Sequence, residues 1–390
     1  MTEDNDLPGD DPRGEPPEEA RPAHPLEPHE HGHSVYEPAE FLDAPADEQI
    51  PEREVSLRSR LLNLPTIGSI VFGLILLFLL FRVVLNVDFG RTFELMGTAN
   101  IGLLVVGLAA YYLTFPLRSL RWWYVLRNVG THVPYRAATE ILFLSWFVNS
   151  VVPAKLGDLY RAYLLKGNFG ASISRTVGTI FIERITDLVV IFGLALAAGY
   201  WSFRGRDMPE VDALFLAGFV FAAVLVAMVV LLRSHGHLVT RLLPERVQEL
   251  YERFHEGSTG ALRPRVLLVI GLITAMVWML EGVRVYFVIR ALDIGLNLGI
   301  SSSIFVALVA SLLTAIPLTP AGMGFVQAGI VGALALYGVS GEAATAVAVT
   351  DFLLATLSVI VFGGLLYAFS PMIRRAHGVR GRQPEVGASR

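Results

Sequence analysis

Apolar residues are grouped into long runs along this chain, and most charged residues lie between the runs. A helix of about 20 apolar residues matches the thickness of the hydrocarbon core of a bilayer. Full transmembrane helices are predicted at about 66–85, 99–117, 176–201, 211–232, 264–291 and 342–369. The pattern therefore predicts an all-α polytopic membrane protein with about six full transmembrane helices.

Two further apolar stretches are short for a helix that crosses a bilayer. Residues 138–152 run into the sequence VPAKLGD, and residues 302–316 precede PLTPAGMG and another short run at 324–339. Irregular backbone at membrane depth is tolerated where protein or water satisfies its polar groups. Both stretches are therefore predicted to form re-entrant or broken helical hairpins.

The two breaks resemble each other, because residues 153–157 read PAKLG and residues 320–324 read PAGMG. Paired broken segments in the two halves of a chain are typical of transporters built from inverted repeats, whose substrate site lies at the repeat interface. This echo favours an inverted repeat. A chance likeness between two turns rich in Pro and Gly is the alternative.

Basic residues predict the orientation, because cytoplasmic connections of membrane proteins carry an excess of Lys and Arg. With the N-terminus inside, the inner connections hold 20 Lys and Arg, whereas the outer connections hold only Arg91, Arg204 and Arg206. This imbalance predicts that both termini are cytoplasmic. The count of 20 against three assumes that the stretch at 138–152 and the stretch at 302–339 each return to the side of the membrane from which they entered.

The composition agrees with a membrane protein, since 53% of the residues are hydrophobic and the mean hydropathy is +0.55. The absence of cysteine excludes disulfides, thiolate catalysis and Cys-based metal sites. Residues 1–55 are Pro-rich and hold 17 Asp and Glu against three Arg, which predicts a disordered cytoplasmic tail. The transmembrane domain is assigned to residues 56–370, and residues 371–390 to a short basic cytoplasmic tail.

The segment from Arg233 to Arg265 is predicted to be cytoplasmic and amphipathic, because large apolar side chains recur in it at helical spacing. Its arginines favour a helix that lies on the inner leaflet. A surface helix that packs on the bundle is the alternative.

Ionisable side chains within the apolar runs are candidate functional groups, because a charge in hydrocarbon requires a cavity or a partner. Glu183, Arg184 and Asp187 lie in one run, and Glu281 and Arg284 lie in another. Arg184 and Asp187 are three residues apart and can pair on one helix face, as can Glu281 and Arg284. The surplus acid of the first set predicts a further base beside it, such as Arg284, or a protonated carboxyl. Structural ion pairs that hold the bundle together are the alternative for both sets.

A third set is predicted at a cytoplasmic mouth. Arg118 and Arg121 lie beside two tryptophans, and Lys155, Asp158 and Arg161 lie in and after the first break. The planar guanidinium matches phosphate, which favours contact with lipid headgroups. Anchoring by basic residues and an aromatic belt is the alternative. It explains Lys155 and Asp158 less well, because they belong to a break predicted at depth.

The second break carries glycines, which let the backbone approach a ligand closely. The amides that begin the following short helix are candidates for binding an anionic group such as phosphate. A purely structural turn is the alternative. The polar and turn-forming residues of this break are Thr314, Pro317, Thr319, Pro320, Gly322, Gly324 and Gln327.

Several catalytic motifs are missing from the sequence. GxxxxGK[ST], HExxH and GxSxG do not occur, and the only DxD spelling lies in the acidic tail. The sequence therefore predicts no enzyme, no catalytic residue, no metal site, no cofactor and no nucleic-acid partner.

Four motifs resemble those of the lysylphosphatidylglycerol synthase transmembrane-region family of flippase-like membrane proteins. They occupy residues 117–122, 149–158, 183–187 and 317–324. The resemblance implies a bundle of the eight-helix class with re-entrant segments, related to the flippase part of the multiple peptide resistance factor. That part moves aminoacylated phosphatidylglycerol between leaflets, and its synthase is a separate C-terminal soluble domain.

Three features of this chain modify what the resemblance implies. The chain stops at Arg390 after a short tail, so aminoacyl transfer is not expected. Asp158 stands where a Glu is commoner, and Gln327 stands where a Glu is often found. The missing carboxylate at Gln327 argues against recognition of a cationic aminoacyl group there.

The expected function is that of a plasma-membrane lipid flippase or transporter. Its substrate would be a phospholipid, an aminoacyl-phospholipid or a polyprenyl-phosphate-linked lipid, and membrane lipids with anionic headgroups are its expected partners. The alternatives are a membrane-embedded glycosyl or lipid transferase, and an accessory of a separately encoded lipid-modifying enzyme. The substrate-binding residues are predicted to be Arg118, Arg121, Lys155, Asp158, Arg161, Glu183, Arg184, Asp187, Glu281, Arg284 and Gln327.

Overall fold

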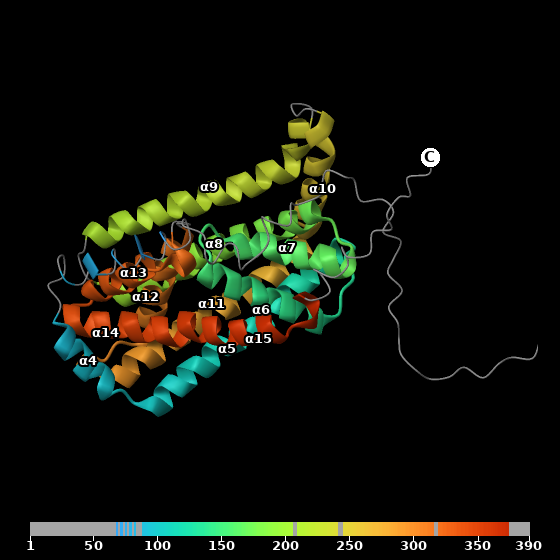
Figure 1. Ribbon diagram of the computed structural model, residues 1–390. Helices are drawn as coiled ribbons and strands as arrows, with labels where there is room; N and C mark the ends of the chain where they lie inside the picture. The colour runs from blue at the N-terminus through green and yellow to red at the C-terminus, as the bar shows by residue number, and fades with distance from the viewer. Residues whose placement is uncertain are drawn as a thin grey trace, which may run out of the picture. The chain divides into compact units, whose positions relative to one another are not determined.

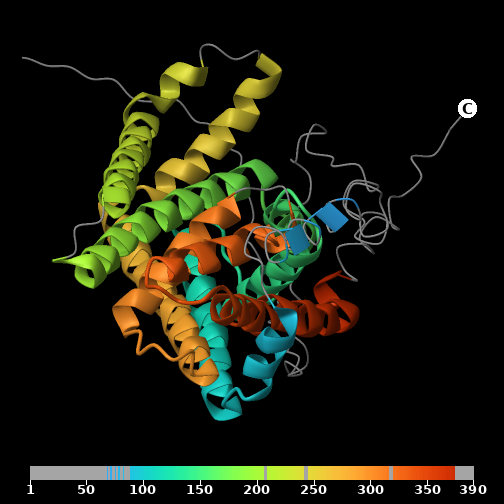
Figure 2. The ribbon, with the colours of Figure 1, turned by 90° about the vertical axis from the view of Figure 1, so that its left-hand side faces the viewer.

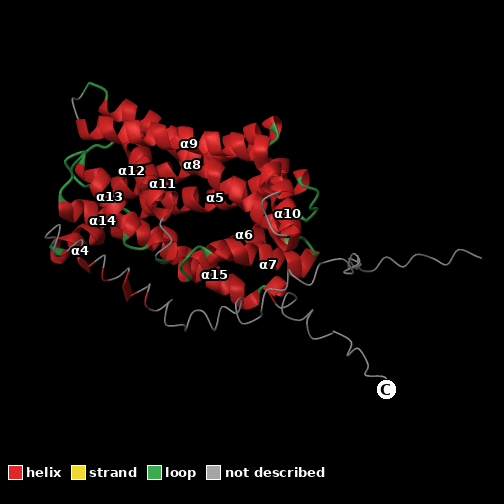
Figure 3. Ribbon diagram, turned by 90° about the horizontal axis from the view of Figure 1, so that it is seen from above, coloured by secondary structure: helices red, strands yellow, loops and turns green. Residues whose placement is uncertain are grey.

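The computed structural model describes residues 88–205, 209–240, 245–315 and 319–373, with isolated positions between 68 and 82. Every regular element in these ranges is a helix, and they contain no strand (Figure 3). The all-α prediction is confirmed. The predicted tail at 1–55, most of the predicted span at 66–85 and the predicted tail beyond 373 lie outside the described residues.

The helices follow the apolar runs of the sequence closely (Figure 1). Each predicted span from 99–117 onward falls within a helix or a continuous pair of helices, except that the first begins two residues before its helix. In chain order they are α4 (Phe89–Gly97), α5 (Ile101–Asn128), α6 (Tyr135–Val151), α7 (Leu156–Phe169), α8 (Ile173–Phe203), α9 (Pro209–Thr240), α10 (Glu245–Ala261), α11 (Pro264–Leu292), α12 (Ile300–Leu312), α13 (Phe325–Ala335), α14 (Gly341–Phe352) and α15 (Ser358–Phe369).

Within the described ranges, three helices are long and apolar enough to cross a membrane. They are α5, α11 and the continuous helix Gly341–Phe369, in which the π turn Leu353–Leu357 joins α14 to α15. α8 has 31 residues, but it carries three charged side chains near its middle. The protein is therefore a multi-pass helical membrane protein. One of its longest helices, α8, has charged residues near its middle.

Close contacts between α5, α8 and α11 bring their polar centres together. α5 and α11 lie side by side, and α8 packs against both. At Gly107 of α5, an added Cβ would lie 3.4 Å from the Cβ of Phe287 in α11. An alanine side chain would therefore fit at this point in ordinary van der Waals contact with α11.

The first predicted hairpin consists of α6 and α7, which pack against each other across the break at 152–155. Ala154 and Lys155 have positive φ angles of 61° and 53°. Gly157 lies against the carbonyl oxygen of Ser145, where an added Cβ would clash. The Asn149 side chain of α6 accepts a hydrogen bond from the Gly157 N–H at 2.8 Å. These contacts fix the start of α7 against the end of α6.

The second predicted hairpin consists of α12 and α13, which also pack against each other. Ala321 and Gly322 have positive φ angles of 52° and 69°, at the same places in the PAxxG sequence as the pair in the first break. Gly324 begins α13 with a φ angle of 89°, and its N–H donates to Gln327 Oε1 at 2.7 Å. Both breaks thus contain two consecutive left-handed residues after a proline. Pro317 lies outside the described residues.

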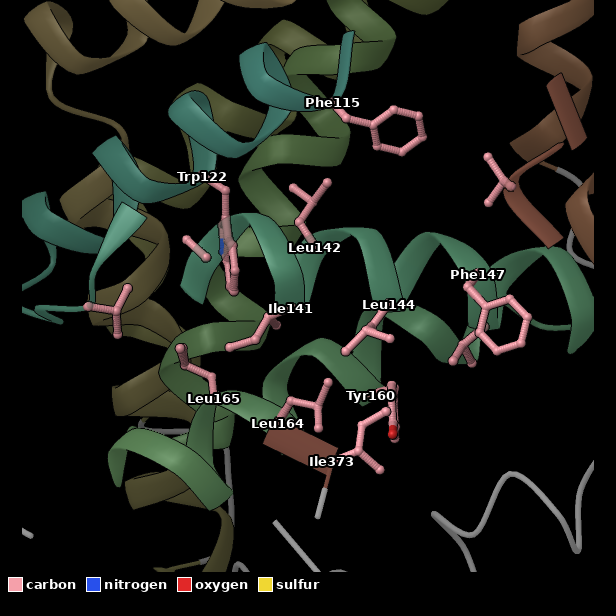
Figure 4. Packing of buried hydrophobic residues seen from close by; sticks show 14 of the residues in the cluster. Phe115, Trp122, Ile141, Leu142, Leu144, Phe147, Tyr160, Leu164, Leu165 and Ile373 are labelled. Carbon is pink, nitrogen blue, oxygen red and sulfur yellow. The ribbon is translucent and has the colours of Figure 1, made fainter. Parts of the chain in front are cut away.

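A hydrophobic core holds the first hairpin against α5 and the end of α15 (Figure 4). Trp122 of α5 is fully buried between Ile141 and Leu142 of α6 and Leu165 of α7. Burying a large apolar side chain stabilises a fold by roughly 1.5–3 kcal/mol. This core therefore positions the first break independently of its polar contacts.

The predicted amphipathic segment contains α10, which packs on α8 beside α9 (Figure 2). Gly178 of α8 lies against the Phe254 carbonyl, and Gly257 of α10 lies against the Arg175 carbonyl. Arg175 and Glu256 form an ion pair of 2.7 Å across the same contact. α10 is therefore a helix packed on the bundle, as the alternative interpretation of this segment predicted.

Candidate functional site

A cavity of about 400 Å³ lies among α5, α6, α8, α11 and the two hairpin breaks. The first break contributes Lys155 and Asp158 to its lining, and the second contributes Thr319, Gly322 and Gln327. The two breaks, more than 150 residues apart in sequence, therefore meet at one polar space inside an apolar bundle. The cavity also has an apolar part, formed by Trp146, Leu188, Ile191, Trp278 and Phe352.

Acids and arginines alternate in a closed arrangement beside this cavity, which we call the charge ring. Its contacts join α5, α7 and α8, and each member has an oppositely charged neighbour on both sides. Because the ring contains three acids and three arginines, it is neutral when all six are ionised. In order around the ring, its members are Asp158, Arg161, Glu183, Arg121, Asp187 and Arg184.

Four of the six contacts in the ring are 3.1 Å or shorter. Arg184 Nη2 and Nε donate to the two oxygens of Asp158 at 2.7 and 2.9 Å, which is a bidentate pair. Arg121 donates to Asp187 at 2.6 Å and also to Glu183. Arg161 donates to Glu183 at 3.1 Å. Bidentate and charge-assisted bonds are the strong class of hydrogen bond, so these pairs fix the relative rotation of the three helices.

Longer contacts close the ring, with Arg161 3.8 Å from Asp158 and Arg184 3.8 Å from Asp187. Arg121 is 1% exposed, whereas the Arg184 side chain is 30% exposed and lines the cavity. Removing one partner of a buried ion pair costs about 3–5 kcal/mol, because an uncompensated charge remains in a medium of low dielectric constant. The ring is therefore a structural unit that faces the cavity on one side.

A second group of charges also lines the cavity, and we call it the α11 cluster: Arg118, Glu281, Arg284 and Asp351. Arg118 donates to Glu281 at 2.7 Å, and Arg284 contacts Glu281 at 3.2 Å. Arg284 Nε lies 3.3 Å from Asp351 Oδ1. All four side chains line the cavity. This cluster is also neutral, with two arginines and two acids.

Aromatic side chains surround the arginine at the start of the α11 cluster. The guanidinium carbon of Arg118 lies 4.4 Å from the ring centroid of Trp146 and 5.2 Å from that of Trp278. The Trp278 indole N–H donates to Asp187 at 3.2 Å. Trp278 thus links the α11 cluster to the charge ring, and cation–π contact stabilises Arg118 where water is excluded.

Lys155 is a basic residue of the site that belongs neither to the charge ring nor to the α11 cluster. It lines the cavity, and no carboxylate of the described residues forms an ion pair with it. Its backbone adopts the left-handed conformation at the N-cap of α7. With the charge ring and the α11 cluster each neutral, the site has six bases against five acids. Its surplus positive charge is carried by a side chain at the cavity wall.

Comparison with known proteins identifies the family. The family described as "Lysylphosphatidylglycerol synthase TM region" matches residues 66–363, which include the charge ring, the α11 cluster and Lys155. The protein belongs to this family. The resemblance of its four motifs to this family is confirmed, and the polar cavity is a feature of a family member.

Several relatives carry the name UPF0104 membrane protein. One from Methanocaldococcus jannaschii is 35% identical over 225 residues, which are 57% of this chain and 93% of that protein. One from Pyrococcus horikoshii is 20% identical over 303 residues, or 71% and 89% of the two chains. The glycosyltransferase AglD of Haloferax volcanii is 26% identical over 364 residues, or 83% of this chain and 58% of that relative. This chain thus matches less than two thirds of the glycosyltransferase.

Most of the predicted substrate-binding residues of this family member lie at the cavity. Eight of the eleven line it: Arg118, Lys155, Asp158, Arg184, Asp187, Glu281, Arg284 and Gln327. Arg121, Arg161 and Glu183 do not line it and are instead buried in the charge ring. Arg121 and Arg161 were expected at a cytoplasmic mouth. Both arginines instead form ion pairs with carboxylates of α8, because they lie on the sides of α5 and α7 that face α8.

Two details of the predicted pairing differ from the structure. Arg184 takes Asp158 of α7 as its close partner, and Asp187 lies farther away at 3.8 Å. The surplus acid of Glu183 and Asp187 is balanced by Arg121 and Arg161, and Arg284 belongs to the other group. A spacing of three residues indicates which side chains share a helix face. The ion-pair partners of these side chains are determined instead by contacts between helices.

One acid of the site was missed by the sequence analysis. Asp351 is buried in α14 within the apolar run at 342–369, and it lines the cavity. The signal was present, because a charged residue inside a predicted span is the same feature that identified Glu281. Gln327 was found, and its side chain accepts a hydrogen bond from Gly324, the N-cap residue of α13.

Proposed function

We propose that this protein binds the phosphate-bearing headgroup of a membrane lipid in the cavity and moves that lipid between leaflets. The observation that carries the proposal is Lys155, a cavity-lining cation without an ion pair among the described residues. Charge-assisted hydrogen bonds are the strong class, so an anion that enters the cavity gains a strong contact with this cation. A phosphodiester carries one negative charge and would balance the surplus of one positive charge.

The shape of the site supports a headgroup as the occupant. A cavity of about 400 Å³ falls in the range of small-molecule sites, which is roughly 300–1,000 Å³. Polar groups from both breaks lie opposite an apolar wall that includes Leu188 and Ile191. A lipid has the same division between a polar headgroup and apolar chains. The partners we propose are therefore membrane lipids with anionic headgroups.

The two breaks support an arrangement in the membrane. We propose that α6–α7 and α12–α13 are re-entrant hairpins beside six full spans, with both termini on the cytoplasmic side of the plasma membrane. Each hairpin has two helices packed against each other and a break at the cavity. Matching left-handed residues at Ala154–Lys155 and Ala321–Gly322 favour an inverted repeat.

A second function is favoured by one relative, which bears the name glycosyltransferase AglD. A membrane-embedded transferase would need a donor site, and its turnover of a polyprenyl-phosphate lipid would be measurable with the pure protein. We propose instead that this chain is not an enzyme and that a separately encoded lipid-modifying enzyme is its partner. Turnover by the isolated protein would favour the transferase.

The proposal is tested by lipid translocation in proteoliposomes. Reconstituted protein should bring fluorescent phosphatidylglycerol from the inner to the outer leaflet, where dithionite quenches it. Lys155→Asn removes the charge, and Asn accepts the left-handed backbone at this position. We expect translocation to fall at least tenfold in Lys155→Asn and to persist in Lys155→Arg, since a loss of about 1.4 kcal/mol corresponds to a factor of ten. Equal rates in all three proteins would contradict the assignment.

A further inference from the structure

Asp351 differs from the other four acids of the charge ring and the α11 cluster in its hydrogen bonds. Asp158, Glu183, Asp187 and Glu281 each accept at least one hydrogen bond from an arginine. In the described part of the chain, no donor hydrogen-bonds to Asp351 Oδ1, although the residue is only 3% exposed. Its single ionic contact is Arg284 Nε at 3.3 Å.

Asp351 and Arg284 are close enough for an ion pair, but the two facing atoms do not form a hydrogen bond. Arg284 Nε is buried and, among the described residues, donates to no acceptor, just as Asp351 Oδ1 accepts from no donor. Arg284 also contacts Glu281, which Arg118 already binds at 2.7 Å. Asp351 is thus the most weakly compensated carboxylate of the site. Burial without hydrogen bonds favours the protonated, neutral form of a carboxyl group.

The surroundings of Asp351 contain few other charges. α11 contributes Glu281 and Arg284, and α5 contributes Arg118. Tyr111 of α5 lies under Arg284, with its ring centroid 5.0 Å from the guanidinium carbon. α13 carries no titratable residue between Phe325 and Ala335. The charged residues of α4, which also packs against α14, are exposed. Arg284 is therefore the group that stabilises the ionised form of Asp351.

Backbone geometry places Asp351 at an irregular point of the helix. The π turn Leu353–Leu357 begins two residues later, and Phe352, Ala355 and Thr356 from this region line the same cavity. π turns inside long helices occur frequently at functional sites. Asp351 therefore lies at the cavity wall, beside this irregular turn.

We propose that Asp351 is a proton-binding site whose protonation is coupled to headgroup binding, so that one proton moves with each phosphodiester anion. This inference rests on the proposed function. An anion in the cavity disfavours a negative charge on Asp351 and so increases its affinity for a proton. A proton taken up from bulk solution by the Asp351 carboxyl group removes the negative charge that faces Arg284. Arg284 Nε, which donates to no acceptor among the described residues, is then available to a phosphate oxygen. By linkage, each ligand increases the affinity for the other by the same factor.

Coupling of this kind makes the transported unit electrically neutral. The headgroup brings one negative charge and the proton one positive charge, while Lys155 stays with the protein. Movement of the pair should therefore respond to a pH gradient and be insensitive to a membrane potential imposed at equal pH. An anion moved alone would respond to the potential instead.

The test measures proton uptake when the purified full-length protein binds dihexanoyl phosphatidylglycerol in weakly buffered detergent solution. We expect the wild type to take up protons on binding, and Asp351→Asn to bind lipid with at least fivefold less uptake. Asp351→Glu should restore the uptake. The matched control is Glu342→Gln, which removes a carboxylate at the start of the same helix, outside the cavity lining, and should leave the uptake unchanged.

Each result decides one of the two proposals. A wild type that binds lipid without taking up protons overturns the coupling alone, and so does an Asp351→Asn variant with unchanged uptake. A wild type that binds no phosphatidylglycerol overturns the headgroup site and, with it, the coupling. Thermal unfolding of Asp351→Asn near the wild-type temperature shows that its lost uptake does not come from misfolding. In proteoliposomes, translocation that follows the potential and ignores the pH gradient also contradicts the coupling.

Discussion

Lys155 and Arg121 are both cations inside an apolar bundle, but their surroundings give them different roles. Arg121 is 1% exposed and bonded to Glu183 and Asp187, whereas Lys155 lines the cavity without an ion pair among the described residues. Removing Arg121 leaves two buried carboxylates without their shared base. Removing Lys155 leaves no acid without a partner. The first residue should therefore determine stability and the second should determine ligand binding.

We expect Arg121→Ala to lower the free energy of unfolding by about 3–5 kcal/mol, because it breaks a buried ion-paired network. Arg127→Ala is the matched control, since Arg127 is an exposed arginine of the same helix that lies over the ring of Trp123. Its effect should stay below about 1 kcal/mol. Thermal unfolding in detergent measures both. An Arg121→Ala protein as stable as Arg127→Ala would show that the ring does not hold α5, α7 and α8 together.

The sequence was sufficient to find every charged residue of the site except Asp351, but it did not predict their partners. Glu183, Arg184, Glu281 and Arg284 stand out because a charge inside an apolar run is rare. Their partners come from other helices, and the rotation of each helix about its axis depends on packing that spacing alone does not encode. Asp158 and Arg184 pair closely for this reason, although they lie 26 residues apart.

At the scale of elements, prediction succeeded where length and composition decide the structure. The run at 264–291 became α11 (Pro264–Leu292) because its predominantly apolar sequence, which has no proline after Pro264, favours one long helix. The short run before residue 153 became one arm of a hairpin because Pro153 and two left-handed residues end the helix. α9 continues to Thr240, beyond the predicted end at 232, because the end of an apolar run marks the end of the hydrophobic segment and not the end of the helix.

The close contact between α6 and α7 predicts the effect of a single methyl group. In Gly157→Ala the new Cβ would overlap the Ser145 carbonyl and the Asn149 side chain, so the hairpin must open. We expect a loss of about 1–3 kcal/mol, the usual cost of overpacking. Gly193→Ala in α8 is the control, since an added Cβ meets nothing there within 4 Å. It should leave stability unchanged or raise it by up to about 1 kcal/mol. Equal unfolding temperatures for the two variants would contradict the packing.

At the scale of the whole molecule, the proposed topology makes a labelling prediction. The chain has no cysteine, so a single introduced cysteine reports on one position without background. His132 is exposed between α5 and α6, on the proposed inner side, and Leu296 is exposed between α11 and α12, on the proposed outer side. An impermeant maleimide should label Leu296→Cys in intact cells and His132→Cys only after permeabilisation. The opposite pattern would invert the proposed orientation.

The meeting of the two breaks at one cavity could be predicted only in part. The paired sequences PAKLG and PAGMG suggested two related turns, and both contain consecutive left-handed residues. That these turns line the same space depends on how α6 and the second break pack, which is a long-range contact. Short-range sequence patterns identify turns, whereas their distance in space follows from the whole bundle.

Affinity for a soluble anionic lipid tests most directly the claim that Lys155 receives a headgroup phosphate. Dihexanoyl phosphatidylglycerol would be titrated into the purified wild type, Lys155→Asn, Lys155→Arg and Lys166→Asn, which removes the only other lysine of the chain. We predict that Lys155→Asn weakens binding about thirtyfold, or roughly 2 kcal/mol, while Lys155→Arg and Lys166→Asn stay within about threefold of the wild type. The same affinity in Lys155→Asn as in the wild type would contradict the claim.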